Sequence, residues 1–259
     1  MRNACYIAVA TGLALGILAF GTTALSQMNA DPQRDRSSVT NAWHVTAFDS
    51  DIDTAFEIIA ARGAYSSAPL SDQLEIYSGD AADTGIRFRV EGIKMDSTRV
   101  TYVDTLKGAT TVTTADSLRH FESFVMFGEA AGAITIREAS DNGEITVVPI
   151  GHLQSYIAHK FCSRRERVYI TQWTGNVTVA TGSVRLQLRI YPDFTDNADI
   201  ADGYRIADEV VLANALSEHY QRTFVEPIEI PRNGMAMIVG LGGAVNSDAV
   251  VTMSGYSDR

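Results

Sequence analysis

The sequence is poor in cysteine and has no spacing typical of a metal site. Its two cysteines are Cys5, which lies inside an apolar N-terminal run, and Cys162. This excludes a disulfide framework within the chain, and the lack of any Cys or His pair at ligand spacing excludes structural zinc. Cys162 is therefore predicted to be a small, buried or half-buried residue.

Catalytic motifs are also lacking. The chain has no Gly-x-Ser-x-Gly elbow, no His-Glu-x-x-His pair and no phosphate loop. The histidines are scattered: His44, His120, His152, His159 and His219. We predict no catalytic, cofactor-binding or metal-binding residue and no enzyme activity. The alternative is an unrecognised site, in which a histidine would lie beside Asp193 or Asp196.

Positive charge is scarce. There are 21 Lys and Arg residues against 31 Asp and Glu, a formal net charge of −10. Nucleic-acid surfaces need clustered Lys and Arg, so no nucleic-acid partner is predicted. The one basic cluster, 163–167, is expected to be a solvated turn.

Two acidic runs are present. Asp49, Asp51 and Asp53 resemble the start of a calcium loop, but the glycine at the sixth position is missing and Ala60 replaces the bidentate glutamate. The loop at 192–202 contains four aspartates and is expected to be solvated.

The N-terminal segment has no charge between Arg2 and Asp31 and is almost wholly apolar from Ala4 to Leu25. One interpretation is a retained helix that contacts a membrane or lies at an oligomer axis, where the Gly12-x-x-x-Gly16 spacing allows close approach. The other is a signal peptide cleaved near Ser26.

Most of the remaining chain has short alternating or β-branched runs between turn residues, which is typical of β-strands. The clearest strand is Ser183–Tyr191, in which Val184, Leu186, Leu188 and Ile190 share one face. Asp141-Asn142-Gly143 predicts a turn, followed by a strand at Glu144–Val148. Other strands are expected at 73–77, 86–90, 99–106, 111–114, 133–137, 155–161, 168–173, 176–180, 224–230, 235–241 and 250–254.

Only Ile206–Tyr220 has the length of a helix, and Gly240–Ala244 is expected to be a hairpin turn. We therefore predict a mainly β protein with two antiparallel, jelly-roll-like β-sandwiches behind an N-terminal apolar helix. The predicted division is 1–26 for the apolar helix, 27–47 for a linker or arm, 48–143 for the first sandwich and 144–259 for the second.

Several segments, taken in order, resemble a family of bacteriophage virion structural proteins that is frequent among marine phages. They include Ser78-x-x-Ala81-x-Asp83-Thr84, Val90–Ile93, Thr105–Gly108, Val112–Thr114, Ala131–Ile136, Ile150–Ser155 and Phe224–Gly234. The similarity covers roughly residues 48–257. It implies a β protein of a virus particle, and it provides no catalytic residues to assign.

The resemblance implies a decoration, spike or minor capsid component located in the virion. Its partners would be copies of itself, by analogy a trimer, and other virion proteins, with membrane contact through the N-terminal helix as an option. The alternative is an exported or membrane-anchored carbohydrate-binding or adhesin-like module, which would use surface aromatic residues. Candidates are Tyr65, Tyr77, Trp173 and Tyr204.

Overall fold

The computed structural model describes residues 41–60, 72–140, 142–178, 182–192, 203–213, 218–243 and 247–258. These residues form sixteen β-strands and no helix. The prediction of a mainly β protein is therefore confirmed. The predicted apolar helix at 1–26 lies outside the described residues.

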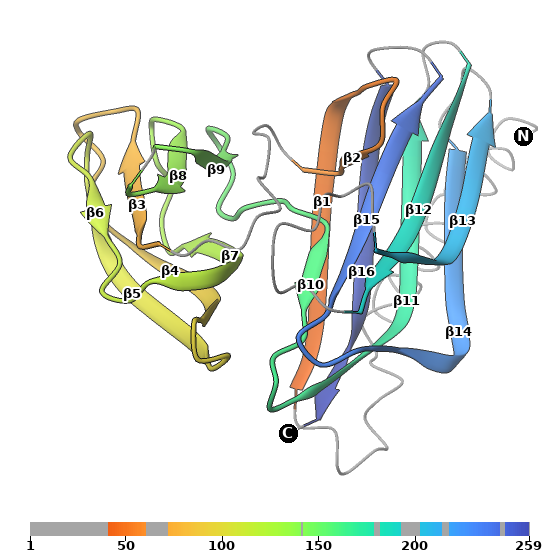
Figure 1. Cartoon of the computed structure of the whole chain (residues 1–259). Helices are drawn as coiled ribbons and strands as arrows, with labels where there is room; N and C mark the ends of the chain where they lie inside the picture. Colours follow the sequence, from red (N-terminus) through yellow and green to blue (C-terminus); the bar gives the residue numbers. More distant parts are fainter. Residues whose placement is uncertain are drawn as a thin grey trace, which may run out of the picture. The chain divides into compact units, whose positions relative to one another are not determined.

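Nine strands form two antiparallel sheets of a sandwich (Figure 1). The first sheet has the order β1-β16-β11-β14, and the second has the order β10-β15-β12-β13, with β2 also paired to β15. The bounds are β1 Asn41–Ile52, β2 Glu57–Ile58, β10 His159–Phe161, β11 Arg167–Thr178, β12 Ser183–Tyr191, β13 Arg205–Ala213, β14 Glu218–Ile230, β15 Met235–Gly242 and β16 Ser247–Asp258.

The two sheets share one hydrophobic core. The alternating residues of β12 that the sequence placed on one face, Val184 to Ile190, are fully buried in it, as predicted. They pack with Trp173 of β11 and Val251 of β16, which belong to the opposite sheet. Burial of apolar surface between the two sheets is therefore what holds the sandwich together.

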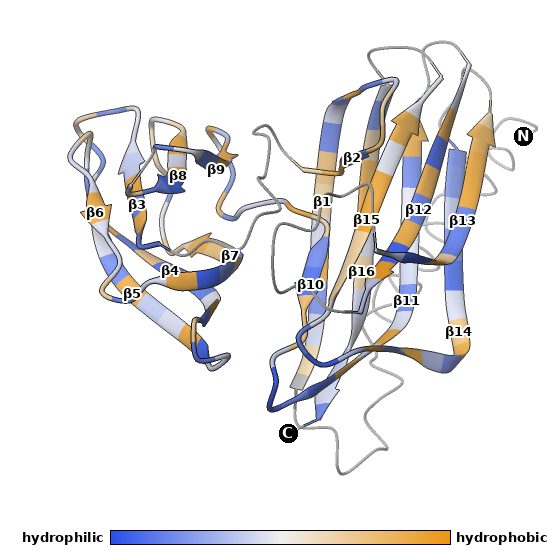
Figure 2. Cartoon of the chain, in the orientation of Figure 1, coloured by the Kyte–Doolittle hydropathy of each residue, from blue (hydrophilic) through white to orange (hydrophobic). Residues whose placement is uncertain are grey.

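Strand β15 is buried on both faces. Its Ala236 and Ile238 lie in the sandwich core, whereas Met237 and Val239 point the other way into a second core. Figure 2 shows the resulting continuous hydrophobic colour along this strand. A strand without a solvated face loses the alternating pattern, as the sequence of β15 does.

The edge strand next to β15 in the second sheet is divided into two pieces, β2 and β10. Ile59 donates a backbone hydrogen bond to Ile238, Ala158 donates to Ile59, and Ile238 donates to Ala158, so the chain leaves after β2 and returns before β10 at the same place on β15. Counting β2 and β10 as one position gives eight positions in chain order. The two sheets then read 1-8-3-6 and 2-7-4-5.

Seven strands lie between β2 and β10 and form two smaller antiparallel sheets, β6-β3-β8-β9 and β5-β4-β7. Their core includes Phe88, Phe121 and Phe124. The bounds are β3 Leu74–Ser78, β4 Thr84–Lys94, β5 Arg99–Lys107, β6 Val112–Thr113, β7 Leu118–Met126, β8 Ile134–Glu138 and β9 Glu144–Val148.

Local turn chemistry was predicted well. Asn142 lies between the antiparallel strands β8 and β9, and it has the positive φ of 62° that asparagine tolerates in turns. The bounds of β9 and β12 are those predicted.

Other expectations were wrong. The helix expected at Ile206–Tyr220 is replaced by β13 and the start of β14. The hairpin expected at Gly240–Ala244 does not form, because β15 and β16 belong to different sheets. The strands expected at 168–173 and 176–180 are one strand, β11, with a bulge after Ile170.

The predicted division into two sandwiches stays a prediction. β1 extends across the expected boundary at 47/48 and pairs with β16, while β9, which begins just after 143, pairs with β8. The strand pairs therefore do not follow the expected boundaries.

Candidate functional site

The sequence predicted no catalytic constellation, and the structure distributes the histidines over several surroundings. His44 is exposed on β1 and hydrogen-bonded to Thr46 at 2.9 Å. His219 is exposed beside Asn176, and His152 packs on Tyr156 and Phe48. His120 and His159 are buried.

Among the described residues, the largest group of interacting charged side chains joins the inserted strands to the sandwich. The Arg99 guanidinium at the start of β5 forms ion pairs with Glu122 of β7 and, at 2.7 Å, with Glu166 in the turn after β10. Lys160 of β10 lies 2.5 Å from Glu122. The side chains of both glutamates are only 4% exposed, so two buried carboxylates are neutralised by two cations.

A β-bulge places Glu122 in this network. Glu91 pairs with Ser123 and the next residue, Gly92, pairs with Phe121, so Glu122 is the extra residue of β7. A bulge re-aims a side chain out of the regular alternation. A side chain at Gly92 would come within 2.6 Å of the His120 carbonyl oxygen, so glycine is required opposite the bulge.

Burial dominates the titration of the groups around the network. Desolvation lowers the pKa of His120 and of His159 to about 3, so both rings are neutral at pH 7. Desolvation, followed by the Arg99 charge, lowers the pKa of Lys160 to about 7, even though Glu122 is its neighbour. Desolvation also raises the pKa of Cys162 to about 12, and this thiol is buried as predicted.

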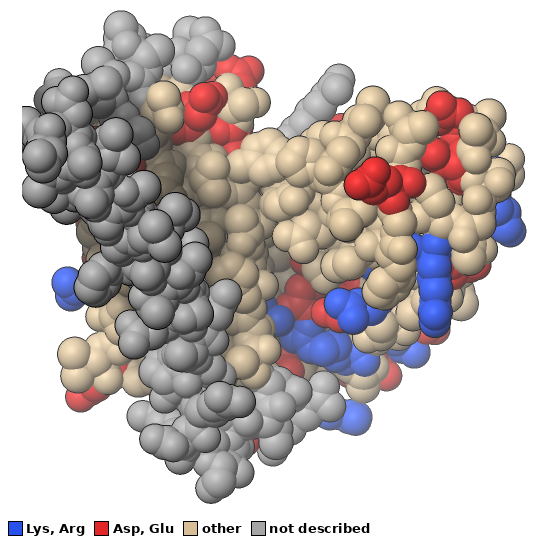
Figure 3. Space-filling model, turned by 180° about the vertical axis from the view of Figure 1, so that it is seen from behind, with Lys and Arg blue, Asp and Glu red and all other residues tan. Residues whose placement is uncertain are grey.

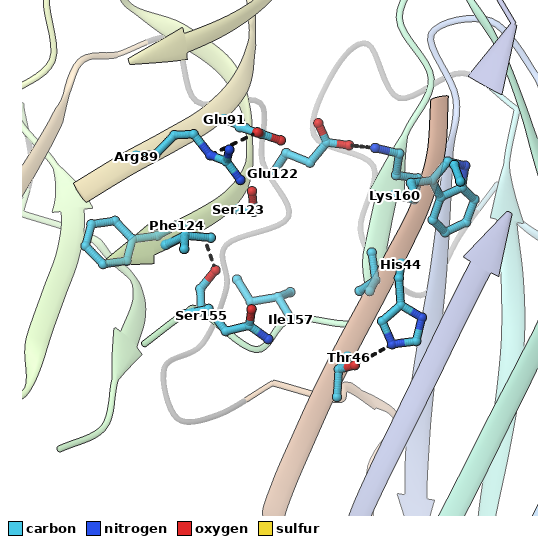
Figure 4. A pocket seen from close by; sticks show the side chains of 15 residues that line it. His44, Thr46, Arg89, Glu91, Glu122, Ser123, Phe124, Ser155, Ile157 and Lys160 are labelled. Carbon is cyan, nitrogen blue, oxygen red and sulfur yellow. Dashed lines mark hydrogen bonds and ion pairs between the residues drawn. The ribbon is translucent and has the colours of Figure 1, made fainter. Parts of the chain in front are cut away.

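Next to the network is a pocket of about 310 Å³. Figure 4 shows Arg89, Glu91 and Glu122 on one side of it, and His44, Thr46 and Lys160 on the other. Further lining comes from Trp43, Ser123, Gln154 and Ser155. The pocket thus combines an indole with charged, hydroxyl and amide groups.

The charges around the pocket are paired. Arg89 Nε lies 3.2 Å from Glu91 Oε1, and Lys160 is paired with Glu122. On the face drawn in Figure 3, acidic and basic side chains are likewise interspersed among the described residues. This pocket therefore has no net formal charge when its Lys160 is protonated.

The basic turn at 163–167 is only partly solvated. Arg164, Arg165 and Arg167 are exposed, as expected, but Glu166 is buried against Arg99. The turn is therefore anchored by its one acidic residue.

The acidic run at 49–53 lies close to Glu57. Desolvation, together with the charges of Asp49, Asp53 and Asp51, raises the pKa of Glu57 to about 7. Among the described residues, no three His, Cys, Asp or Glu side chains are grouped so that they could hold a metal ion. The acidic loop with Asp193 and Asp196 lies outside the described residues.

The aromatic side chains proposed for ligand binding have other roles where the structure describes them. Trp173 is fully buried and its indole donates to Asp208, so the expectation that it lies on the surface was wrong. Tyr77 lies under the Arg137 guanidinium, and Tyr204 under that of Arg189. Tyr65 lies outside the described residues.

The network and pocket residues were not predicted as a site. Their only signal in the sequence is a carboxylate within an aromatic run, Phe121-Glu122-Ser123-Phe124, where a strand interior would otherwise be apolar. No spacing rule brings Arg99, Glu122 and Lys160 together.

None of the described residues belongs to a helix of the length and apolarity needed to cross a membrane.

Comparisons with known proteins give weak structural matches. No protein-family model and no curated protein matches the chain. The CBM22-1–CBM22-2 tandem of Xyn10C from Paenibacillus barcinonensis matches with a TM-score of 0.23 and 8% identity, covering 81% of this chain and 93% of that one.

Two further matches are viral. The T13 particle of infectious bursal disease virus gives a TM-score of 0.21 and 10% identity over 85% of this chain and 73% of that chain. The VP2 subviral particle of the same virus gives a TM-score of 0.21 and 11% identity, covering 86% of this chain and 73% of that chain. Similarity is thus seen to viral capsid proteins and to a carbohydrate-binding tandem, at a level that assigns neither function.

Proposed function

We propose that this chain is a structural component of a virus particle, and specifically a decoration, spike or minor capsid protein of the kind found in bacteriophages. It would bind copies of itself and other virion proteins, with a trimer as the expected assembly, and would perform no chemical reaction. The observation that carries the proposal is the strand order of the sandwich.

The order 1-8-3-6 and 2-7-4-5 is that of a jelly roll, in which the first and last strands are neighbours and the chain passes between the sheets at nearly every turn. This architecture recurs in viral capsids, lectins and cupins. Fold alone does not decide among them, so a second argument is needed.

The second argument comes from the segments that resemble phage virion proteins. Three of them meet around one buried carboxylate, Asp83. The Ser78 hydroxyl donates to Asp83 at 2.5 Å, the backbone of Ala131 and Gly132 donates to it at 2.9 Å each, and Gly108 donates to its carbonyl oxygen at 2.8 Å.

These contacts show why those short motifs are spaced as they are. Burial would raise the pKa of Asp83, but the hydrogen bonds from Ser78, Ala131 and Gly132 outweigh it and hold the pKa below its usual value. Gly108 has a φ of 63°, and a Cβ there would lie 2.3 Å from the Ala81 carbonyl oxygen. The motifs therefore have a structural role, which fits a protein that works through assembly.

The proposal is tested on particles purified on a density gradient from the native source without lipid. We expect tryptic peptides of this chain in the particle fraction, and cross-linking of intact particles should give a homo-oligomer band, three copies if the trimer is right. A matched sample of the clarified culture fluid is the control.

The proposal fails if the chain is absent from particles and is recovered from the culture fluid with an intact mass that begins near Gln27. That result would favour the exported module. A mass that includes Met1, found in particles, would favour the virion assignment and a retained apolar segment.

A further inference from the structure

The pocket of about 310 Å³ that Trp43, Arg89 and Glu91 help to line has no role in the proposed assembly function. We propose that it binds a neutral saccharide unit, such as one ring at the end of a glycan. The inference goes beyond the virion role, because it concerns what such a protein recognises, and it does not depend on that role.

Charge balance supports a neutral ligand. When Lys160 is protonated, both cations of the pocket are already paired with a carboxylate of the pocket, Arg89 with Glu91 and Lys160 with Glu122. An anionic or cationic ligand would have to break one of these pairs or remain uncompensated. A neutral ligand can instead bond to the atoms that the pairs leave available.

Several such atoms remain. The Trp43 Nε1–H is buried and has no hydrogen-bond partner among the described residues. A buried donor without a partner is costly, so a ligand oxygen that bonds to this N–H once the indole turns toward the pocket would be stabilising. Ser155 Oγ accepts from the Phe124 amide at 2.9 Å, which leaves the serine proton to donate. Glu91 uses Oε1 for Arg89, which leaves Oε2 to accept.

These groups suit adjacent hydroxyls. A sugar hydroxyl both donates and accepts, so it is matched by a pocket that is lined by donors such as Trp43 and by acceptors such as Glu91. The amide of Gln154, which also lines the pocket, supplies both kinds of atom. The volume is near the lower end of small-molecule sites, roughly 300–1,000 Å³, and suits a compact ring.

Binding is tested by saturation-transfer NMR on the full chain with glucose, galactose, mannose and N-acetylglucosamine, and with N-acetylneuraminic acid and glucose 6-phosphate as charged probes. We expect saturation transfer to at least one neutral sugar, with a dissociation constant on the order of 1 mM, since a ring in an open pocket makes few contacts. The charged probes should show none.

Two substitutions have matched controls. Trp43→Phe keeps an aromatic ring and removes the unpartnered N–H, whereas Trp173→Phe makes the same change at the only other tryptophan, inside the sandwich. Glu91→Gln removes a pocket charge, whereas Glu75→Gln changes the equivalent ion pair with Arg137, which does not line the pocket. Each pocket variant should weaken binding about tenfold.

Three results would overturn the proposal. The first is the absence of transfer to all four neutral sugars with folded protein, judged by its near-ultraviolet circular dichroism. The second is unchanged affinity in both pocket variants, which would place any binding elsewhere. The third is stronger binding of a charged probe than of any neutral sugar, which would show that the ion pairs open.

Discussion

Replacing Arg99 with methionine removes the cation that contacts both buried glutamates while keeping an unbranched apolar side chain. Glu122 would retain Lys160 at 2.5 Å, whereas Glu166 would lose its cation and keep only the hydrogen bond from the Ser163 amide at 3.0 Å. The carboxylate of Glu166 is 4% exposed, so the variant creates an uncompensated buried charge.

Breaking a buried ion pair by removing one partner costs about 3–5 kcal/mol. The Arg99 side chain is 19% exposed, so some water can reach the vacated site. We therefore expect a loss near the lower end, about 3 kcal/mol, in the free energy of unfolding. Urea unfolding followed by circular dichroism measures it, provided that the m-value is unchanged.

The matched control is Arg137→Met. Arg137 pairs with Glu75 at 2.6 Å, but these side chains are 26% and 20% exposed, so the expected loss is smaller, about 1 kcal/mol. Adding Glu166→Gln to Arg99→Met should recover about 1.5 kcal/mol, because the unpaired charge is then absent. The argument would be refuted if Arg99→Met lowered the free energy of unfolding no more than Arg137→Met does. It would also be refuted if the effects of Arg99→Met and Glu166→Gln were additive.

Three further predictions follow from single buried or half-buried groups. An unfolded histidine has a pKa near 6.5, whereas the pKa of buried His120 is about 3. The free energy of unfolding should therefore fall as the pH drops below 6.5, by about 2 kcal/mol per such histidine at pH 5. Urea unfolding of His120→Gln should show a flatter dependence on pH. The raised pKa of Glu57 means that its carboxylate destabilises the fold as pH rises from 4.5 to 7, so Glu57→Gln should raise the melting temperature at pH 8 but not at pH 4. Asp83→Asn turns an amide N–H toward a backbone donor and should cost about 2 kcal/mol in urea unfolding, whereas an unchanged midpoint would exclude the role assigned to Asp83.

The sequence predicted strands best where a clear apolar or alternating run lies between turn residues. In β12 the alternation of Val184, Leu186, Leu188 and Ile190 with polar residues gave the correct bounds, since period-2 hydrophobicity is a local signal, although Gln187 and Arg189 on the other face are also buried. β13 and β14 are end strands of their sheets with exposed residues on both faces, including Val225, which is fully exposed. Without burial there is no alternation, so this region was mistaken for a helix.

The pocket and the ion-pair network could not be predicted, because they depend on long-range pairing. Arg99 and Glu166 are 67 positions apart in the chain, and Glu122 faces them only because of a bulge in β7. The division of the edge strand into β2 and β10 depends on Ile59 and Ala158, which both form backbone hydrogen bonds with Ile238. No residue type in the sequence marks that contact.

The same network should also influence the pocket. Arg99 does not line the pocket, but its ion pairs hold Glu122, which does, and connect β5 and β7 to the turn after β10. Arg99→Met leaves Trp43, Glu91 and Gln154 unchanged, yet it should weaken saccharide binding about threefold, because the two sides of the pocket lose a fixed spacing.

The measurement is a titration of the folded variant at 25 °C beside Arg137→Met, which should bind as the unchanged protein does. Equal affinity in the two variants would mean that the pocket walls are held by apolar packing alone, through residues such as Phe124 and Ile157. Because neither substitution removes a pocket side chain, a selective loss at Arg99 would indicate that the buried charges also position the ligand site.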